Sequence, residues 1–169
     1  MKQAWIVVFL LSLTIAMLKA NASDGLTSRS APTVLVFVSF SMPHQSLEAI
    51  LRDAKKIHAT VVIRGLINNS FQSTMLRIAE LVKTSGGDGM VLNPLWFKRL
   101  AIKQVPSVVV VPEGSICFTK DACSEDRDYD RITGDIPLSA ALKMIRDKGN
   151  VAQAIATSAL NQLQDTSHG

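Results

Sequence analysis

The chain has 169 residues, 47% of them hydrophobic and 19% charged, a composition that fits one globular domain and excludes disordered, collagen-like and low-complexity chains. Its 18 Lys and Arg and 14 Asp and Glu residues give a formal net charge of +4, and only 5% of the residues are aromatic. So small a charge without an aromatic stacking platform predicts that the chain does not bind nucleic acid.

The N-terminus has the pattern of a secretory signal peptide. Met1 and Lys2 give a short positive start, residues 4–18 form an apolar run, and Ala20-Asn21-Ala22 supplies the small residues that a signal peptidase recognises. The apolar run is shorter than the ~20 residues that span a bilayer. We therefore expect residues 1–22 to be removed by cleavage after Ala22, with export to an oxidising compartment and no stable membrane insertion afterwards.

The next residues predict a leader, a strand, a helix and a second strand. Residues 23–33 are rich in Ser and Thr and predict a flexible leader. Residues 34–40 are almost continuously apolar, which is typical of a strand buried on both faces. Pro43 suits the first turn of a helix, and apolar residues recur at helical spacing over 47–57. The β-branched residues 60–63 predict a second buried strand.

A second helix, a short extended piece and a third strand follow. The helix has candidate N-caps at residues 68–70, ends at Gly86-Gly87 and carries an apolar stripe formed by Phe71, Met75, Ile78, Leu81 and Val82. Residues 90–92 predict an extended piece, and Pro94 begins a turn of helix that runs through Leu100. Residues 107–111 predict a third buried strand.

The C-terminal third predicts antiparallel strands and a helix. After the turn at residues 112–114, residues 115–118 are expected to pair back as a hairpin arm, and residues 129–133 to form the last strand. Pro137 begins a helix that Gly149 ends, and residues 150–169 form a C-terminal tail that includes an Ala-rich, weakly amphipathic segment with a helical pattern.

This order of elements predicts an α/β fold with a mixed central sheet and helices on both faces. The first two strands are joined by a crossover helix and must be parallel, whereas the later strands are antiparallel. Strand, helix, strand, helix and then a proline at the entrance to the third strand is the thioredoxin-like layout. The Val105-Pro106 bond is a candidate for a cis peptide. We expect the thioredoxin-like domain to span residues 34–149.

The first strand-to-helix turn lacks the thiols of a redox enzyme. Catalytic thioredoxin-like chains carry Cys-x-x-Cys there, because the helix N-terminus lowers the pKa of the thiol. This chain has Ser39-Phe40-Ser41-Met42-Pro43-His44 instead. Ser41 and His44 would need an orienting acid, and the sequence places none, so we predict no catalytic residue. Met42 suits either a contact surface or the core.

Cys117 and Cys123 are the two cysteines of the chain. Two cysteines in an exported protein normally pair, so we predict a structural disulfide. A redox pair is the alternative, although the spacing is not Cys-x-x-Cys and the site begins no helix. Acidic residues crowd this segment without the spacing of a calcium loop and predict a solvated loop or an acidic patch facing a partner: Asp121, Glu125, Asp126, Asp128 and Asp130.

The remaining polar residues predict no cofactor. His44, His58 and His168 share no ligand spacing with each other or with the cysteines, so we expect no metal site. Lys98-Arg99 and Lys103 form a small basic patch that we interpret as a solvated face.

Five short motifs, in this order, carry a resemblance to a known family. They are Phe37–Pro43 (FVSFSMP), Val62–Leu66 (VIRGL), Asn93-Pro94 with Phe97, Val105-Pro106-Ser107 and Gly134-Asp135-Ile136. With these motifs, from about residue 34 to 145, the chain resembles the TrbC family of pilin assembly proteins of F-type conjugative transfer systems. It departs from the family at Asn93, where we expect an aspartate.

The resemblance implies a thioredoxin-like fold without a redox motif. It also implies a periplasmic protein that acts in assembly of the conjugative pilus and its type IV secretion channel, with a TraW-like protein and other pilus or channel assembly components as partners. We therefore expect a non-catalytic adaptor. Its protein-binding surface would be the one that redox relatives use to hold an extended peptide: Ser39, Phe40, Ser41, Met42, Pro43, Val105 and Pro106. The alternative is a periplasmic thiol–disulfide oxidoreductase or isomerase that uses Cys117 and Cys123.

Overall fold

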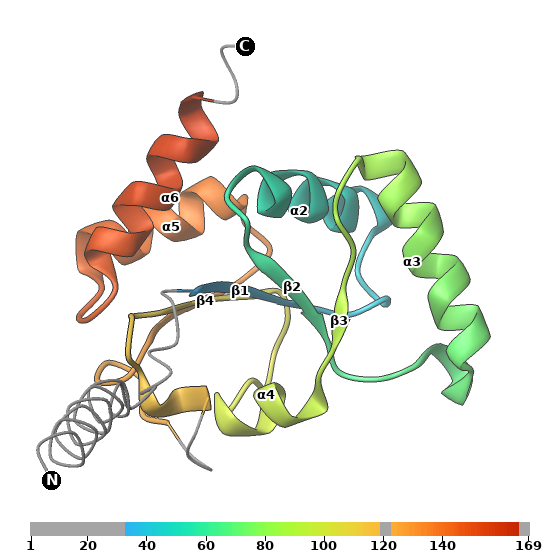
Figure 1. Ribbon diagram of the computed structural model, residues 1–169, viewed down its shortest axis with the longest axis horizontal. Helices are drawn as coiled ribbons and strands as arrows, with labels where there is room; N and C mark the ends of the chain where they lie inside the picture. The colour runs from blue at the N-terminus through green and yellow to red at the C-terminus, as the bar shows by residue number, and fades with distance from the viewer. Residues whose placement is uncertain (1–32, 119–122, 166–169) are drawn as a thin grey trace, which may run out of the picture.

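Five strands form one mixed sheet at the centre of the structure, a computed structural model that describes residues 33–118 and 123–165 (Figure 1). The predicted signal peptide and nearly all of the predicted leader lie outside the described residues. The strand order is β3-β2-β1-β4-β5, in which β1, β2 and β3 are parallel and β4 and β5 are antiparallel to their neighbours. The strands are β1 (Thr33–Val38), β2 (Thr60–Ile63), β3 (Val91–Leu92), β4 (Ser107–Val111) and β5 (Asp130–Thr133).

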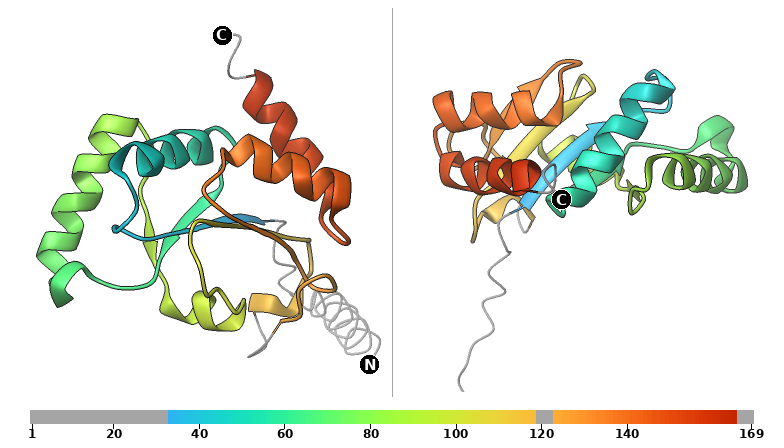
Figure 2. Two further views of the ribbon diagram at one scale, coloured as in Figure 1. Left: turned by 180° about the vertical axis from the view of Figure 1, so that it is seen from behind. Right: turned by 90° about the horizontal axis from the view of Figure 1, so that it is seen from above.

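Helices cover both faces of this sheet (Figures 1 and 2). The helices α2, α5 and α6 lie on one face, α4 lies on the other, and α3 packs beside α2. Their bounds are α2 (His44–Lys56), α3 (Phe71–Ser85), α4 (Pro94–Arg99), α5 (Leu138–Lys148) and α6 (Gln153–Asp165), with short 3-10 turns at η2 (Ile67–Asn69) and η3 (Ile116–Phe118). Within residues 33–118 and 123–165, no helix combines the length and apolarity needed to cross a lipid bilayer.

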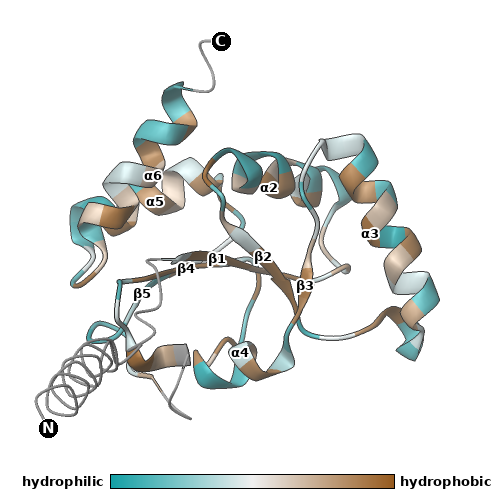
Figure 3. Ribbon diagram, viewed as in Figure 1, coloured by the Kyte–Doolittle hydropathy of each residue, from teal (hydrophilic) through white to brown (hydrophobic). Residues whose placement is uncertain are grey.

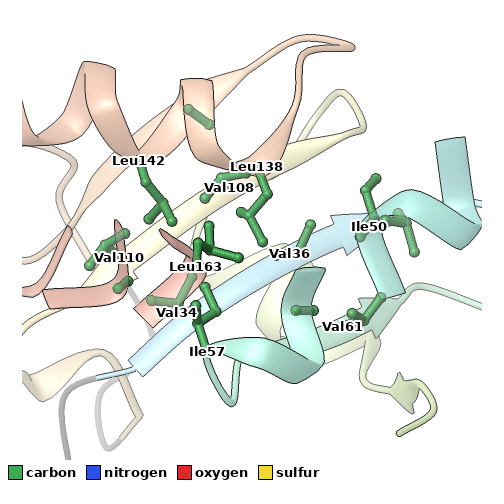
Figure 4. Close-up of a cluster of buried hydrophobic side chains, with 14 of the residues drawn as sticks. Val34, Val36, Ile50, Ile57, Val61, Val108, Val110, Leu138, Leu142 and Leu163 are labelled. Atoms are coloured by element: carbon green, nitrogen blue, oxygen red, sulfur yellow. The ribbon is translucent and has the colours of Figure 1, made fainter. Parts of the chain in front are cut away.

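Two hydrophobic cores form because the side chains of β1 and β4 alternate between the two faces of the sheet. Val34, Val36 and Val38 of β1 point into the core beneath α2, α5 and α6. Figure 4 shows part of this core, with labelled side chains from β1 and from each of the three helices. Leu35 and Phe37 point into the opposite core, beneath α4. Figure 3 shows the resulting concentration of hydrophobic residues in the central strands. The continuous apolar run in the sequence therefore reflects burial on both faces.

The predicted fold class is confirmed, since parallel β1 and β2 sit beside antiparallel β4 and β5 in a mixed α/β arrangement of thioredoxin-like type.

One predicted element is wrong: residues 115–118 do not pair as a hairpin arm. Residues 116–118 form η3 instead, and the N–H of Cys117 donates to the hydroxyl of Ser115 at 3.3 Å. Cys117 is buried in the core beneath α4, and the chain turns inward to place it there.

Helix α3 has the predicted ends but not the predicted buried face. The Ser70 hydroxyl accepts a hydrogen bond from the N–H of Ser73 and caps the first turn, and Gly86 ends the helix in a left-handed conformation with φ of 69°. Of the apolar stripe, only Leu81 is fully buried, whereas Phe71 is 64% exposed and Met75 is also exposed. The first part of the stripe lies in solvent and the rest is partly or fully buried, because α3 packs against α2 at the edge of the molecule rather than over the sheet.

Helix α6 belongs to the packed domain, although the sequence placed it in a tail beyond Gly149. Its buried side chains join the same core as those of β1 and α5: Ala156, Ala159, Leu160 and Leu163. The Asp130 carboxylate connects this helix to the sheet, because it accepts hydrogen bonds from the N–H groups of residues 150, 151 and 152 at 2.8, 2.9 and 2.7 Å. Asp130 is only 3% exposed, so its assignment to a solvated loop is wrong.

Gly149 makes this contact sterically feasible. A Cβ atom at this position would lie 2.5 Å from the carbonyl oxygen of Ile145 and 2.6 Å from Oδ2 of Asp130. Only a residue without a side chain therefore lets the chain leave α5 close enough to the buried carboxylate to present three consecutive N–H groups to it.

We predict that Asp130→Asn lowers the free energy of unfolding by about 1–3 kcal/mol, because an amide group would face buried N–H donors that the carboxylate oxygens now satisfy. Urea unfolding followed by circular dichroism measures this difference. The matched control is Glu113→Gln, the same change at an exposed carboxylate, which should alter stability by less than about 0.5 kcal/mol. Equal stabilities of the two variants would contradict the role assigned to Asp130.

Candidate functional site

A pocket of about 210 Å³ opens at the edge of the sheet where the parallel strands β1 and β2 end. In open α/β sheets, ligands bind outside the carboxyl ends of parallel strands, and this pocket has that position. Its walls come from the ends of β1 and β2, from α4 and from the connection between α4 and β4: Val38, Ser39, Phe40, Ile63, Arg64, Gly65, Phe97, Ile102, Lys103 and Val105.

The turn after β1 supplies one side of the pocket. The N–H of Met42 donates to the carbonyl of Ser39 at 3.1 Å, and the hydroxyl groups of Ser39 and Ser41 lie 3.0 Å apart. Ser39 and Phe40 line the pocket. Ser41 and Pro43 are exposed outside it, and Met42 is partly buried against the core beneath α2. The structure thus divides this turn and places only its first two residues at the pocket.

His44 has an acidic neighbour that the sequence analysis missed. Its Nδ1 atom lies 3.4 Å from Oε2 of Glu48, one helical turn further along α2. The i, i+4 spacing on a predicted helix could have identified this pair. The hydroxyl of Ser41 pairs with that of Ser39 rather than with His44 in the described part of the chain.

The connection before β4 supplies the opposite side of the pocket. The Val105-Pro106 peptide bond is cis. Val105 is half-buried and lines the pocket, whereas Pro106 is buried and its carbonyl accepts the N–H of Gly134 at 3.0 Å. The Ser107 hydroxyl lies 2.7 Å from the carbonyl of Gln104 and 2.8 Å from the Thr133 hydroxyl. This segment is therefore held to β5 on its far side and open to the pocket on its near side.

An aromatic stack connects the floor of the pocket to its rim. The rings of Phe37 in β1 and Phe97 in α4 meet edge to face, with centroids 4.8 Å apart and planes at 83°. The guanidinium carbon of Arg64 lies 5.9 Å from the centroid of the Phe97 ring, a cation–π geometry. Arg64 and Lys103 are both exposed, and neither forms an ion pair with any carboxylate of residues 33–118 and 123–165.

Helix α4 is fixed at both ends by hydrogen bonds to its backbone. The Asn93 side-chain oxygen accepts the N–H of Trp96 at 3.0 Å, so asparagine performs the capping role that an aspartate would also perform. The Tyr129 hydroxyl donates to the carbonyl of Leu100 at 2.9 Å, and Arg131 donates to the carbonyl of Ala101 at 3.1 Å. These bonds position the segment that carries Ile102 and Lys103 into the wall of the pocket.

Cys117 and Cys123 form a disulfide with their Cα atoms 5.2 Å apart. Cys117 is 1% exposed in the core beneath α4, with Cys123 packed against that core. Neither sulfur lines the pocket. Residues 119–122 between them, and with them Asp121, lie outside the described residues. In the part of the chain that the structure describes, no three His, Cys, Asp or Glu side chains come together as metal ligands would.

Sequence reasoning found part of this site. It assigned Ser39, Phe40 and Val105 to a binding surface, interpreted Lys103 as solvated and gave Arg64 no role. The missed signal is topological: two parallel strands end at the edge of the sheet where an antiparallel strand begins. The motifs at residues 37–43, 62–66 and 105–107 therefore had to meet there.

The comparisons with known proteins show the family of this chain. A family model described as "Type-F conjugative transfer system pilin assembly protein" matches residues 36–145, a span that contains every residue of the pocket. The chain belongs to this family. The resemblance inferred from the five motifs is thereby confirmed.

One relative extends the comparison beyond the family span. The chain is similar to "Periplasmic protein TrbC" of Escherichia coli (strain K12), with 31% identity over 136 residues. The matched region covers 80% of this chain and 57% of that relative, so the chain spans little more than half the length of the relative. No solved structure matches the chain at a significant level.

Burial raises the pKa of Tyr129 above 10.0, because the neutral phenol is favoured away from water. We predict that this tyrosine, the only one in the chain, ionises at higher pH in the folded protein than in urea. Its contribution to stability is complete below the unfolded pKa and is lost as the pH rises through the folded pKa. Ultraviolet titration of tyrosinate in native buffer and in urea measures both values, and coincident midpoints would contradict the burial of Tyr129.

Proposed function

We propose that the chain is a non-catalytic adaptor in assembly of the F-type conjugative pilus and that it works in the periplasm. The observation that carries this proposal is the pocket at the ends of β1 and β2. It combines an apolar floor with two exposed cations and contains no thiol. Family membership and the periplasmic relative support the setting. The predicted signal peptide of residues 1–22 supports export.

The partner segment would run in extended form across the pocket. Ser39 and Phe40 lie on one side and Val105 on the other, and pairing with main-chain groups at these two walls would supply affinity. An apolar side chain of the partner would enter between Ile63, Phe97 and Ile102 and supply selectivity. A TraW-like protein and other pilus or channel components are the partners proposed.

We predict that Gly65→Leu abolishes capture of a TraW-like partner by the tagged chain. Gly65 lines the pocket, its φ is not in the left-handed region, and a Cβ atom there meets no heavy atom within 4 Å. The substitution should therefore occupy the pocket without disturbing the backbone. Co-purification of the partner from cells that express the transfer operon, compared at equal amounts of folded chain, measures the effect.

The matched control for this experiment is Thr157→Leu, which adds a leucine at an exposed position of α6. It should capture the partner as the unsubstituted chain does. This pair of variants is a sharper test than a substitution of Met42, because Met42 packs against the core. Undiminished capture by Gly65→Leu would refute the proposed binding site.

The competing function is a thiol–disulfide oxidoreductase or isomerase that uses the two cysteines. The burial of Cys117 speaks against it, because a nucleophilic thiol has to be reached by its substrate. We predict that the double variant Cys117→Ala/Cys123→Ala lowers the free energy of unfolding by about 2 kcal/mol and still captures the partner. Urea unfolding and co-purification measure the two effects. A folded double variant that has lost pilus assembly would favour the redox function.

A further inference from the structure

A second hollow of about 310 Å³, lined by the α4–β4 connection and β5, shares the side chain of Lys103 with the pocket. Lys103 lines both hollows, and Arg131 and Thr133 of β5 line the second. We call these two neighbouring hollows together the α4 groove. Its two parts could receive successive residues of an extended segment, because an extended chain advances by about 3.3 Å per residue.

The charged residues described along the α4 groove have one sign. Arg64, Lys103 and Arg131 line it, and no Asp or Glu among residues 33–118 and 123–165 lines either hollow. Arg131 pairs with Glu125, whereas Arg64 and Lys103 pair with no carboxylate in the described ranges 33–118 and 123–165. The side chain of Arg64 is held at the groove by another contact, because its guanidinium lies over the buried ring of Phe97. A groove with an apolar floor and two cations, Arg64 and Lys103, is complementary to a peptide in which an apolar side chain is followed by carboxylates.

We propose that the α4 groove selects acidic partner segments, in which an apolar residue enters the pocket and the carboxylates that follow it face Arg64 and Lys103. The inference rests on the proposed function, since it specifies the chemistry of the segment that the adaptor holds. A protein segment fits better than a nucleic acid, because two exposed cations neutralise too few phosphates to hold a polyanion. Arginine adds selectivity for carboxylate, since its planar fork can donate two hydrogen bonds to one group.

Short synthetic peptides with blocked ends test this chemistry directly on the purified chain. One peptide carries Leu-Asp-Asp at its centre, a second carries Leu-Asn-Asn, and a third carries Ser-Asp-Asp. Amide NMR shifts of Ser39, Gly65 and Lys103 report binding at the groove. We expect the Leu-Asp-Asp peptide to bind at least about tenfold more tightly than either other peptide at ~0.05 M salt, and its advantage over Leu-Asn-Asn to shrink at ~0.5 M salt.

The double variant Arg64→Met/Lys103→Met removes both charges and keeps unbranched side chains of similar length. It should abolish the preference for aspartate over asparagine. The matched control is Lys143→Met/Lys148→Met, which removes two exposed lysines of α5, on the other face of the sheet, and should keep the preference. Equal affinity for the Asp and Asn peptides would overturn the proposal, as would tighter binding of a single-stranded oligothymidylate.

These outcomes separate the inference from the function on which it rests. If Gly65→Leu blocks capture of the TraW-like partner and the peptides show no preference for aspartate, the acidic specificity is wrong and the adaptor function stands. If the aspartate preference depends on Arg64 and Lys103 but Gly65→Leu captures the partner normally, the groove binds acidic segments and the proposed adaptor site is wrong.

Discussion

The burial of β1 on both faces is the constraint on which the rest of this structure depends. Five of its six residues are buried, and they alternate between two cores. A strand of this kind is stable only if helices cover both sides of the sheet, because each uncovered face would expose a row of large apolar side chains to water. The positions of α2, α5 and α6 on one side and of α4 on the other follow from this requirement.

The candidate site derives its geometry from the same strand. Phe37 of β1 packs against Phe97, and Phe97 in turn lies beneath Arg64 at the surface. A surface cation is therefore positioned by a residue at the centre of the sheet. Short connections complete the site, since the pocket lies where the strands end, between the turns after β1 and β2 and the α4–β4 connection, and its apolar floor is the exposed margin of the core beneath α4.

Polar anchors complete the fold where apolar packing does not define the path of the chain. Tyr129, directly before β5, and the first two residues of β5 alternate between the two sides of the sheet. Asp130 faces α5 and α6 and holds the backbone N–H groups before α6, whereas Tyr129 and Arg131 face α4 and hold carbonyl groups at its C-terminal end. Each anchor satisfies backbone groups of a segment that directly precedes or follows a helix. One edge strand thus fixes segments on both faces.

The sequence by itself determined the fold class, because continuous apolar runs at residues 34–40 and 107–111 and the crossover between the first two strands leave few other topologies. It also indicated the family, through short motifs that need no tertiary information. Helix caps such as Ser70 and Asn93 can also be recognised in a sequence, because the side chain of a cap bonds to a backbone N–H within four residues of the chain.

The tertiary structure decided what depends on contacts between distant residues. The sequence does not distinguish Asp130 from the acidic residues around it. Of those that the structure describes, only Asp130 is buried and accepts hydrogen bonds from three N–H groups some twenty positions later. The apolar stripe of α3 is regular, yet the position of that helix at the edge leaves Phe71 and Met75 in solvent. Arg64, Lys103 and Phe97 became one site only when the ends of β1 and β2 met the connection before β4. Local patterns specify elements, whereas the packing of elements selects which side chains face water, the core or a partner.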